Sequence, residues 1–245
     1  MKKNTKQKRG EIIYGVHPLI ELLKAGKRSI YTIYTTKPEP KAWRYIKPLL
    51  PKKPIQIQYV SRESLRKIAG TTDHQGFAAL VQTFVFKKQL FSPKQHPFLV
   101  LLDSIQDVGN VGAIIRSAYC ANCDGVVICQ KAGAPLTAAA IKSSAGLAEH
   151  IPVYQAPSVQ HAAKELKNAG YNLYLATLDG KDARSVEYKS PLCLVIGNEA
   201  KGISSSIMNL GEHITLAQRK SDISYNASVA AGILLFTVSS SLHKL

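Results

Sequence analysis

From Phe98 onward, short apolar runs alternate with stretches of helical pattern, and this alternation restricts the fold more than any other feature of the chain. Phe98–Leu102 is a continuous apolar run, as in a strand buried on both faces, and Gly125–Cys129 is a second. Further strands are expected near 151–154, 171–177 and 192–196, with helices near 137–146, 158–169 and 203–210. Such alternation is typical of an α/β domain in which helices cover a mostly parallel sheet.

The last expected helix, about 226–242, is apolar nearly all round. It carries Val229, Ile233, Leu234, Leu235, Phe236 and Val238. A helix without a polar face needs cover on more than one side. We therefore expect this helix to be buried, in part by a second subunit.

The first part of the chain has the pattern of a separate, smaller α/β unit over residues 11–86. Strands are expected at 30–35, 55–60 and 76–85, and helices at 17–25, at 40–50 and from the N-cap Ser61 to Gly70. Residues 87–97 are charged and contain two prolines, which is typical of a linker. A second domain is then expected over 98–245, and residues 1–10, with five basic residues and no acidic one, are expected to form a flexible arm.

The positive charge is concentrated in the first part of the chain. The protein has 245 residues and a formal net charge of +16. Residues 1–95 hold 20 Lys and Arg against 5 Asp and Glu, whereas residues 96–245 hold 12 against 11. A one-sided excess of this kind favours a polyanionic partner, because phosphate contacts supply most sequence-independent affinity for nucleic acid.

Several other classes of protein find little support in the sequence. No uncharged apolar run reaches the length of about 18 residues that a membrane span requires, and no apolar signal core follows the basic N-terminus, so the cytoplasm is the expected compartment. Cys120 and Cys123 form a C-x-x-C, but no second close pair completes a four-ligand zinc site, and no metal is expected. Ordinary reduced thiols are favoured for this pair, with a redox role as the alternative.

The segment Asp103–Arg116 is the first of three that carry chemistry. An apolar strand ends, a loop with Gly109 follows, and a helix is expected to begin near Asn110, a residue type favoured at the N-cap. Arg116 lies off the apolar face of that helix and can point into a cleft. Strand, glycine loop and helix also open a dinucleotide-binding fold, but the G-x-G-x-x-G spacing is absent.

Two later segments also place polar residues directly after buried strands. The run Leu192–Ile196 leads into Gly197, Asn198 and Glu199, and ligands of α/β sheets bind beyond the carboxyl ends of strands. A strand at 214–217 leads into a polar loop that opens the final helix, which Ser224 or Asn226 can cap. Taken singly, each segment is also compatible with simple turns and helix caps.

Together, the three segments resemble, in order and spacing, the three motifs of the SpoU family within the SPOUT superfamily. The motifs are Asn110-Val-Gly-Ala-Ile-Ile-Arg116, Gly197-Asn-Glu-Ala-Lys-Gly202 and Ser224-Tyr-Asn-Ala-Ser-Val-Ala230. Members of this family are RNA ribose 2′-O-methyltransferases. Residues 14–23 and 74–78 also resemble the auxiliary RNA-binding domain of the branch that methylates guanosine in large-subunit rRNA, a domain that is similar to a small ribosomal protein.

The resemblance implies a fold, a methyl donor and partners. The C-terminal domain would be an α/β domain with a deep trefoil knot that binds S-adenosylmethionine and forms a homodimer, and its RNA would be 23S rRNA. The implied donor-binding residues are Thr177, Ile196, Gly197, Leu216 and Tyr225. The implied catalytic residues are Asn110, Arg116, Glu199, Ser224 and Asn226.

The chain departs from the family at two places in the donor site. Tyr225 stands where leucine is common, and the loop 218–223 is more charged than the family's loop of glycine and serine. The resemblance implies that Arg116 removes the proton of the 2′-hydroxyl. A guanidinium is normally fully protonated, so a second role is considered for Arg116: it holds an RNA phosphate and stabilises negative charge on the 2′-oxygen.

Three other functions remain open from the sequence. The first is a methyltransferase that acts on tRNA instead of rRNA. The second is a non-catalytic RNA-binding ribosome-assembly factor that kept the fold. The third is an oxidoreductase that uses a nucleotide cofactor. The missing dinucleotide spacing counts against the oxidoreductase.

Overall fold

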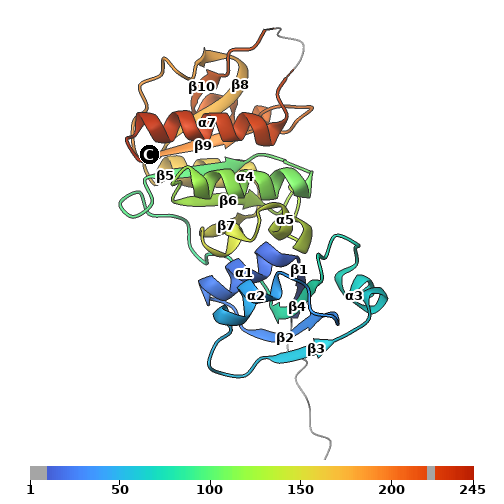
Figure 1. The fold of residues 1–245 in the computed structure, drawn as a ribbon. Helices are drawn as coiled ribbons and strands as arrows, with labels where there is room; N and C mark the ends of the chain where they lie inside the picture. The colour runs from blue at the N-terminus through green and yellow to red at the C-terminus, as the bar shows by residue number, and fades with distance from the viewer. Residues whose placement is uncertain (1–9, 220–223) are drawn as a thin grey trace, which may run out of the picture. The chain divides into compact units, whose positions relative to one another are not determined.

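The computed structural model describes residues 10–219 and 224–245, and Figure 1 shows its fold. By internal contacts the chain divides into two compact units, residues 1–85 and 86–245. The expected arm, residues 1–10, lies outside the described residues except for Gly10, which is the first residue of a strand.

The first unit is a four-stranded sheet with helices. Its elements are β1 (Gly10–Tyr14), α1 (Val16–Ala25), β2 (Ile30–Thr35), α2 (Trp43–Ile46), the 3-10 turn η1 (Lys47–Leu49), β3 (Gln56–Tyr59), α3 (Arg62–Ala69) and β4 (Phe77–Gln82). The strand order is β1-β4-β2-β3. Strand β4 is antiparallel to β1 and β2, and β3 runs parallel to β2 at the edge.

Local sequence explains the limits of these elements. Ser61 caps α3, because its side chain accepts a hydrogen bond from the backbone N–H of Ser64 at 3.1 Å, and Gly70 ends the helix in the left-handed region. The stretch expected as one helix at 40–50 is divided into α2 and η1. Pro48 lies inside η1 and has no backbone N–H to continue an α-helix.

The second unit is a six-stranded parallel sheet in which every strand pair runs the same way. Its elements are β5 (Phe98–Leu102), α4 (Val108–Cys120), β6 (Gly125–Cys129), α5 (Ala138–Ser143), η2 (Leu147–Glu149), β7 (Val153–Ala156), α6 (Val159–Asn168), β8 (Asn172–Asp182), β9 (Leu192–Ile196), η3 (Ser205–Leu210), β10 (Glu212–Thr215) and α7 (Ala227–Ser241). The strand order is β10-β8-β9-β5-β6-β7. The central strands β5, β6 and β9 are buried along their whole length.

Helices cover both faces of this sheet. Leu99 and Leu101 of β5 pack in one cluster with Leu166 of α6. Because side chains alternate along a strand, the residues between them face the opposite side. Helices α4 and α7 contact each other and lie side by side in Figure 1. Among the described residues, no helix is long and apolar enough to span a bilayer.

The segment expected to be a linker, 87–97, packs against the second unit. The backbone N–H of Lys87 donates to the carbonyl of Val153 at 2.8 Å. Phe91 is buried, and its ring fills the space next to Gly125, where an added Cβ would lie 2.3 Å from ring atoms. Residues from Phe86 onward therefore belong to the second unit.

The C-terminal residues after α7 are held on the sheet. The ammonium of Lys244 lies 2.8 and 2.7 Å from the two carboxylate oxygens of Asp124, the residue directly before β6. The hydroxyl of Ser239 donates to the carbonyl of Ala121 at 2.6 Å. These contacts fix α7 beside the end of α4.

Candidate active site

A cavity of about 590 Å³ lies at the carboxyl ends of β9 and β10 and beside the middle of β8. Its lining residues come from 176–179 of β8, 196–203 at and after the end of β9, 214–218 at the end of β10 and 224–234 at the start of α7, with Met208 of η3. Its position is the one at which open α/β sheets bind ligands. Its volume lies in the range of small-molecule sites, which is about 300–1,000 Å³.

A bulge in β8 turns one strand toward the cavity. Consecutive residues of β10, His213 and Ile214, pair with Leu175 and Lys181 of β8, so residues 176–180 leave the ladder. Gly180 permits the close approach of β10, because an added Cβ would lie 2.5 Å from backbone atoms of Ile214. Strand irregularities next to active sites often change the direction of side chains. This one brings residues 176–179 to the cavity wall.

Thr177, an expected donor-binding residue, is left with an unsatisfied polar atom at this wall. Its Oγ1 atom is buried and has no hydrogen-bond partner within the described chain. A buried hydroxyl without a partner costs about 1–3 kcal/mol, so its partner has to be sought outside the chain, in a water or a ligand. The atom therefore fits a cavity that holds a polar small molecule.

The turn after β9 forms a second wall and is built on close backbone contacts. An added Cβ on Gly197 would lie 2.4 Å from the backbone carbon of Gly202, so no side chain fits there. Asn198 and Gly202 exchange two backbone hydrogen bonds of 3.0 and 2.9 Å. Gly202 has a φ of +66°, in the left-handed region that glycine adopts without strain.

Side chains tie this turn to the loop after β5. The Oδ1 atom of Asn198 accepts backbone hydrogen bonds from Ala200 and Lys201 at 2.9 and 3.1 Å, and its Nδ2 donates to the carbonyl of Ser104 at 2.9 Å. Asp103 is fully buried, and its carboxylate accepts hydrogen bonds from the backbone N–H and hydroxyl of Ser204. The first and second motif segments are therefore held together at their base.

Sequence reasoning assigned no role to Asp103 or Asn198. One signal was available for Asp103, which is a carboxylate directly after the buried run Phe98–Leu102. A charged residue at the carboxyl end of a buried strand needs partners, and the neighbouring strand's turn supplies them here.

Two of the expected catalytic residues touch. The Nδ2 atom of Asn110 donates to the Oε1 atom of Glu199 at 2.6 Å, across 89 positions of sequence. Asn110 is almost fully buried, whereas Glu199 is exposed and lines the cavity. The contact places the first motif at the cavity's edge.

The helix α4 begins near Asn110, as expected, but Asn110 is not its N-cap. The helix begins at Val108, and Asp107 is the N-cap, with its Oδ1 atom accepting from the backbone N–H of Gly109 at 2.6 Å. Aspartate and asparagine are equally good caps, so residue type alone does not separate them. Because Asn110 is inside the first turn, its side chain is available for Glu199.

The third segment lines the cavity from the side of α7. Leu216 and Tyr225 border the cavity together with Thr177, Ile196 and Gly197, so all five expected donor-binding residues meet there. Ser224, an expected catalytic residue, also lines it. Asn226 caps α7, as one of the two expected caps, by accepting from the backbone N–H groups of Ser228 and Val229 at 2.9 and 3.4 Å. The charged loop expected at 218–223 lies outside the described residues from 220 onward.

Arg116 is placed apart from the other expected catalytic residues. It is exposed on α4 and is not among the residues that line the cavity. It follows Asn110 by six positions, which is about 9 Å of helix rise. Within one chain, the described site thus brings together Asn110, Glu199 and Ser224, but not Arg116.

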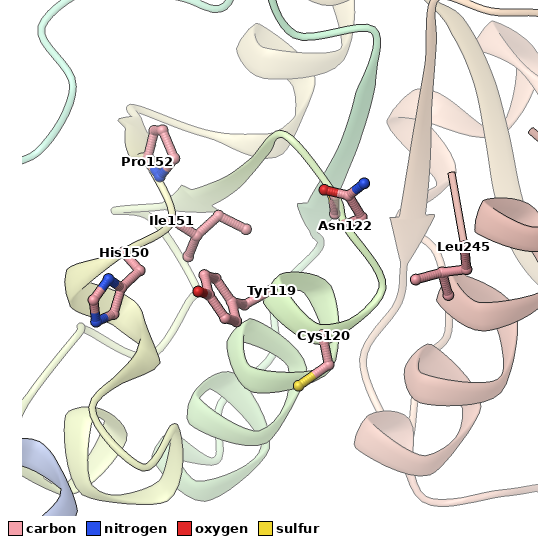
Figure 2. Close-up of a pocket in the computed structure, with 8 residues that line it drawn as sticks. Tyr119, Cys120, Asn122, His150, Ile151, Pro152 and Leu245 are labelled. Carbon is pink, nitrogen blue, oxygen red and sulfur yellow. The ribbon is translucent and has the colours of Figure 1, made fainter. Parts of the chain in front are cut away.

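A second cavity, of about 430 Å³, lies at the far end of α4 and contains none of the expected site residues (Figure 2). It is lined by Tyr119, Cys120, Asn122, Cys123, His150, Ile151, Pro152 and Leu245. The rings of Tyr119 and His150 lie 5.7 Å apart.

All four cysteines are free thiols, and only Cys120 is exposed. Cys123 is buried and donates to the carbonyl of Phe98 at 3.3 Å, and burial raises its pKa to about 12. Within the described ranges 10–219 and 224–245, no group of three or more His, Cys, Asp or Glu is placed to hold a metal ion.

Comparison with known proteins identifies the family. Residues 97–236 match the model of the SpoU rRNA Methylase family, and residues 12–85 match that of the RNA 2′-O ribose methyltransferase substrate-binding domain. A Bacillus subtilis protein named as a TrmH family tRNA/rRNA methyltransferase, YacO, is 31% identical over 239 residues, which cover 93% of this chain and 94% of the relative. The chain therefore belongs to the SpoU methylase family of RNA methyltransferases.

Solved structures show the same fold. The SpoU methyltransferase AviRb from Streptomyces viridochromogenes, solved in complex with AdoMet, has a TM-score of 0.79 at 20% identity and covers 96% of this chain and 91% of its own. An AdoMet-bound rRNA methyltransferase from Sinorhizobium meliloti has a TM-score of 0.79 at 22% identity, covering 100% of this chain and 92% of its own. The predicted fold class, a SPOUT-type parallel α/β domain with a small N-terminal α/β domain, is confirmed.

Proposed function

We propose that this chain transfers a methyl group from S-adenosylmethionine to a ribose 2′-hydroxyl in RNA, and that its substrate is a guanosine of large-subunit rRNA. The observation that carries the proposal is the cavity at the carboxyl ends of β9 and β10, where Thr177, Ile196, Gly197, Leu216 and Tyr225 meet beside the Asn110–Glu199 pair. Family membership supports the reaction class. The rRNA preference is supported by the separate basic N-terminal domain, residues 11–86, as the RNA-binding part.

The donor fits the cavity chemically. Ile196, Leu216 and Leu234 offer apolar contacts for an adenine ring, and the buried Oγ1 of Thr177 offers a polar atom for hydrogen bonding. The bulge of β8 and the turn at Gly197 bring backbone to the cavity wall. When bound, the donor supplies an electrophilic methyl group on a sulfonium, which needs no metal for activation.

The chain's own residues then position the ribose and balance its charge. Methyl transfer would form a bond from the 2′-oxygen to the methyl carbon while the bond from that carbon to the sulfonium sulfur breaks, which would release the donor as a neutral thioether. The proton of the 2′-hydroxyl would pass to water. Arg116 holds an RNA phosphate and stabilises negative charge on that oxygen, because a guanidinium is a poor base. Asn110, Glu199, Ser224 and Asn226 orient the ribose and Arg116. Since Oδ1 of Asn226 is engaged in capping α7, its amide nitrogen is the group available for the ribose.

A homodimer is part of the proposal. Val229, Ile233 and Phe236 are exposed on α7 by 49%, 40% and 62%. They are four and three positions apart and so form one apolar stripe. A second copy over this stripe would cover it and bring the exposed Arg116 of the neighbouring α4 into an interface. We also propose the family's trefoil knot, supported by the turn at 197–203 and the start of α7 bordering one cavity.

The test uses tritiated S-adenosylmethionine, the purified protein and total RNA from a strain that lacks the gene, with Arg116→Ala alongside. Label in large-subunit rRNA that resists alkaline cleavage at one nucleotide is the expected result. A 2′-O-methyl group blocks that cleavage, and Arg116→Ala should give no label. Label in tRNA would show that the substrate is tRNA and not rRNA. Donor binding without label in any RNA, including that of assembling ribosomal particles, would support a non-catalytic RNA-binding factor instead.

A further inference from the structure

The carboxyl ends of two parallel strands in the N-terminal unit carry an exposed tyrosine among charged side chains. Tyr59 is the last residue of β3 and pairs in register with Thr35, the last residue of β2. The loop after β2 therefore lies at the same sheet edge, and it supplies Lys37 and Glu39. We call the four residues Lys37, Glu39, Lys47 and Tyr59 the Tyr59 patch.

Specific contacts hold the patch in one arrangement. The hydroxyl of Tyr59 donates to Oε1 of Glu39 at 2.6 Å, and the ammonium of Lys47 lies 3.1 Å from Oε2 of the same carboxylate. The ammonium of Lys37 lies 4.6 Å from the centre of the Tyr59 ring. The hydrogen bond from Tyr59 is the largest cause of a lowered pKa for Glu39, and the Lys47 ammonium also lowers it.

The patch is anchored to the core of its unit and remains accessible. Trp43, on the helix just before Lys47, is buried and stacks on Phe77 of β4 with ring centres 5.6 Å apart. Tyr59 nevertheless keeps 42% of its surface exposed, and the Lys47 side chain 57%. A rigid aromatic ring that stays exposed is suited to stacking on a flat ligand.

The surrounding charge points to a polyanion. Residues 37–59 contain six Lys and Arg and one acidic residue, Glu39. That one carboxylate is engaged with Tyr59 and Lys47. A second ring in this stretch, Tyr45, is 55% exposed with the Arg44 guanidinium 4.6 Å from its centre. Cations beside exposed rings are the combination with which proteins bind unpaired nucleotides, since phosphates meet the cations and bases stack on the rings.

We propose that the Tyr59 patch binds an unpaired nucleotide of the RNA substrate, with the base stacked on the Tyr59 ring and a neighbouring phosphate at Lys37 and Lys47. The proposal rests on the proposed function, because it names how the substrate is held. Paired bases cannot offer a free face to the ring, so the patch selects a loop, bulge or end over a duplex. Glu39 acts as a positioning residue by fixing the Tyr59 hydroxyl and the Lys47 ammonium.

The test measures RNA affinity of the full chain by fluorescence anisotropy at fixed salt. The probes are a labelled 20-nucleotide RNA of mixed, unstructured sequence and the same strand annealed to its complement. Tyr59→Leu should weaken binding of the single strand by about 5- to 100-fold, the range for loss of one base–ring stack. Tyr59→Phe keeps the ring and should bind within about twofold of the wild type.

A matched control separates the patch from general charge. Lys67 on α3 is 72% exposed and carries the same charge as Lys37, but its described partner is Glu63, at 3.8 Å, and not an aromatic ring. Lys37→Gln should weaken single-strand binding more than Lys67→Gln does. Thermal unfolding of every variant shows whether it remains folded. Tyr59→Phe removes only the hydroxyl, so it shows whether RNA binding depends on the ring or on the hydroxyl.

Two results overturn the proposal: equal single-strand affinity for Tyr59→Leu and the wild type, or an equal loss for Tyr59→Phe and Tyr59→Leu. Methyl transfer is measured on the same proteins. If the wild type transfers methyl groups to RNA and Tyr59→Leu leaves the RNA affinity unchanged, the patch is overturned but the proposed function is not. Stacking on Tyr59 without transfer to any RNA supports the patch and contradicts the proposed function.

Discussion

Asp103 and Ser204 are joined by two hydrogen bonds at the base of the candidate active site. The carboxylate accepts from the backbone N–H of Ser204 at 2.6 Å and from its hydroxyl at 2.8 Å, and Asp103 is fully buried. Because Ser204 follows the turn at 197–202, Asp103 fixes the position of that turn relative to β5. It acts on the site through the turn and does not line the cavity.

Substitution of Asp103 should therefore weaken donor binding as well as stability. Asp103→Ala leaves the two partly buried donors of Ser204 without an acceptor, and the free energy of unfolding should fall by about 1–3 kcal/mol. Asp103→Asn keeps one acceptor oxygen and should fold, with a higher KM for the donor and a smaller change in kcat. Urea unfolding and steady-state kinetics check both. An unchanged KM in a folded Asp103→Asn would show that the turn does not depend on this contact.

Gly197 is expected to be intolerant of any side chain. In Gly197→Ala the new Cβ would lie 2.4 Å from the backbone carbon of Gly202, so the turn must open and the cavity wall must move. Donor affinity measured by calorimetry should fall at least about tenfold, a loss of about 1.4 kcal/mol.

Gly232→Ala is the matched control. A Cβ there would meet the Ser117 hydroxyl oxygen at 3.4 Å and the Ser117 Cβ at 3.9 Å, which are ordinary contacts, and alanine is the better helix former by about 1 kcal/mol. Gly232→Ala should bind the donor normally. Equal affinities for the two variants would contradict a donor site at the turn.

Local patterns were sufficient for most elements of the fold. The run Leu192–Ile196 is apolar at every position, and it is a strand with those limits. Ser61 and Gly70 bound α3 as expected from their capping preferences. These signals are local, because burial on both faces and capping are encoded within a few residues.

The parts that the sequence could not show depend on contacts between distant segments. The bulge at 176–180 exists because Ile214 pairs with Lys181, and nothing near Thr177 in sequence announces it. The bond between Asn110 and Glu199 spans 89 positions, so their proximity followed only from the family resemblance. Asp107 and Asn110 are both capping types three positions apart, and tertiary contacts decide between them.

Asn110 and Glu199 should act as one unit in methyl transfer. Glu199→Ala and Asn110→Ala each remove the 2.6 Å hydrogen bond, and each should lower kcat/KM by about 10- to 100-fold. The double variant should lose little more, because the contact is already gone. Glu199→Gln retains an acceptor oxygen and should stay close to the wild type. Fully additive losses in the double variant would mean that the two residues work independently.

Thiol reactivity should distinguish the two cysteines of the C-x-x-C. Cys120 is exposed, whereas burial raises the pKa of Cys123, and that of Cys129, to about 12. The nucleophile is the thiolate, and a raised pKa keeps the buried thiols protonated throughout the pH range 7–9. Iodoacetamide at pH 8 should label Cys120 in the native protein and all four cysteines in denaturant. Native labelling of Cys123, read by mass spectrometry, would contradict the structure at the end of α4.

The ion pair between Lys244 and Asp124 should stabilise the fold more than an exposed pair does. Both side chains are mostly buried, at 19% and 22% exposure, and Asp124 also accepts from the backbone N–H of Phe98 at 2.8 Å. Lys244→Met removes the cation and leaves a partly desolvated carboxylate, so the free energy of unfolding should fall by about 1–3 kcal/mol. Lys181→Met is the control, because Lys181 forms a pair of the same 2.7 Å length with Glu212 but is 72% exposed. That variant should lose clearly less stability in urea unfolding, because water and salt screen an exposed ion pair. Equal losses for the two variants would show that burial of the C-terminal pair adds nothing to its strength.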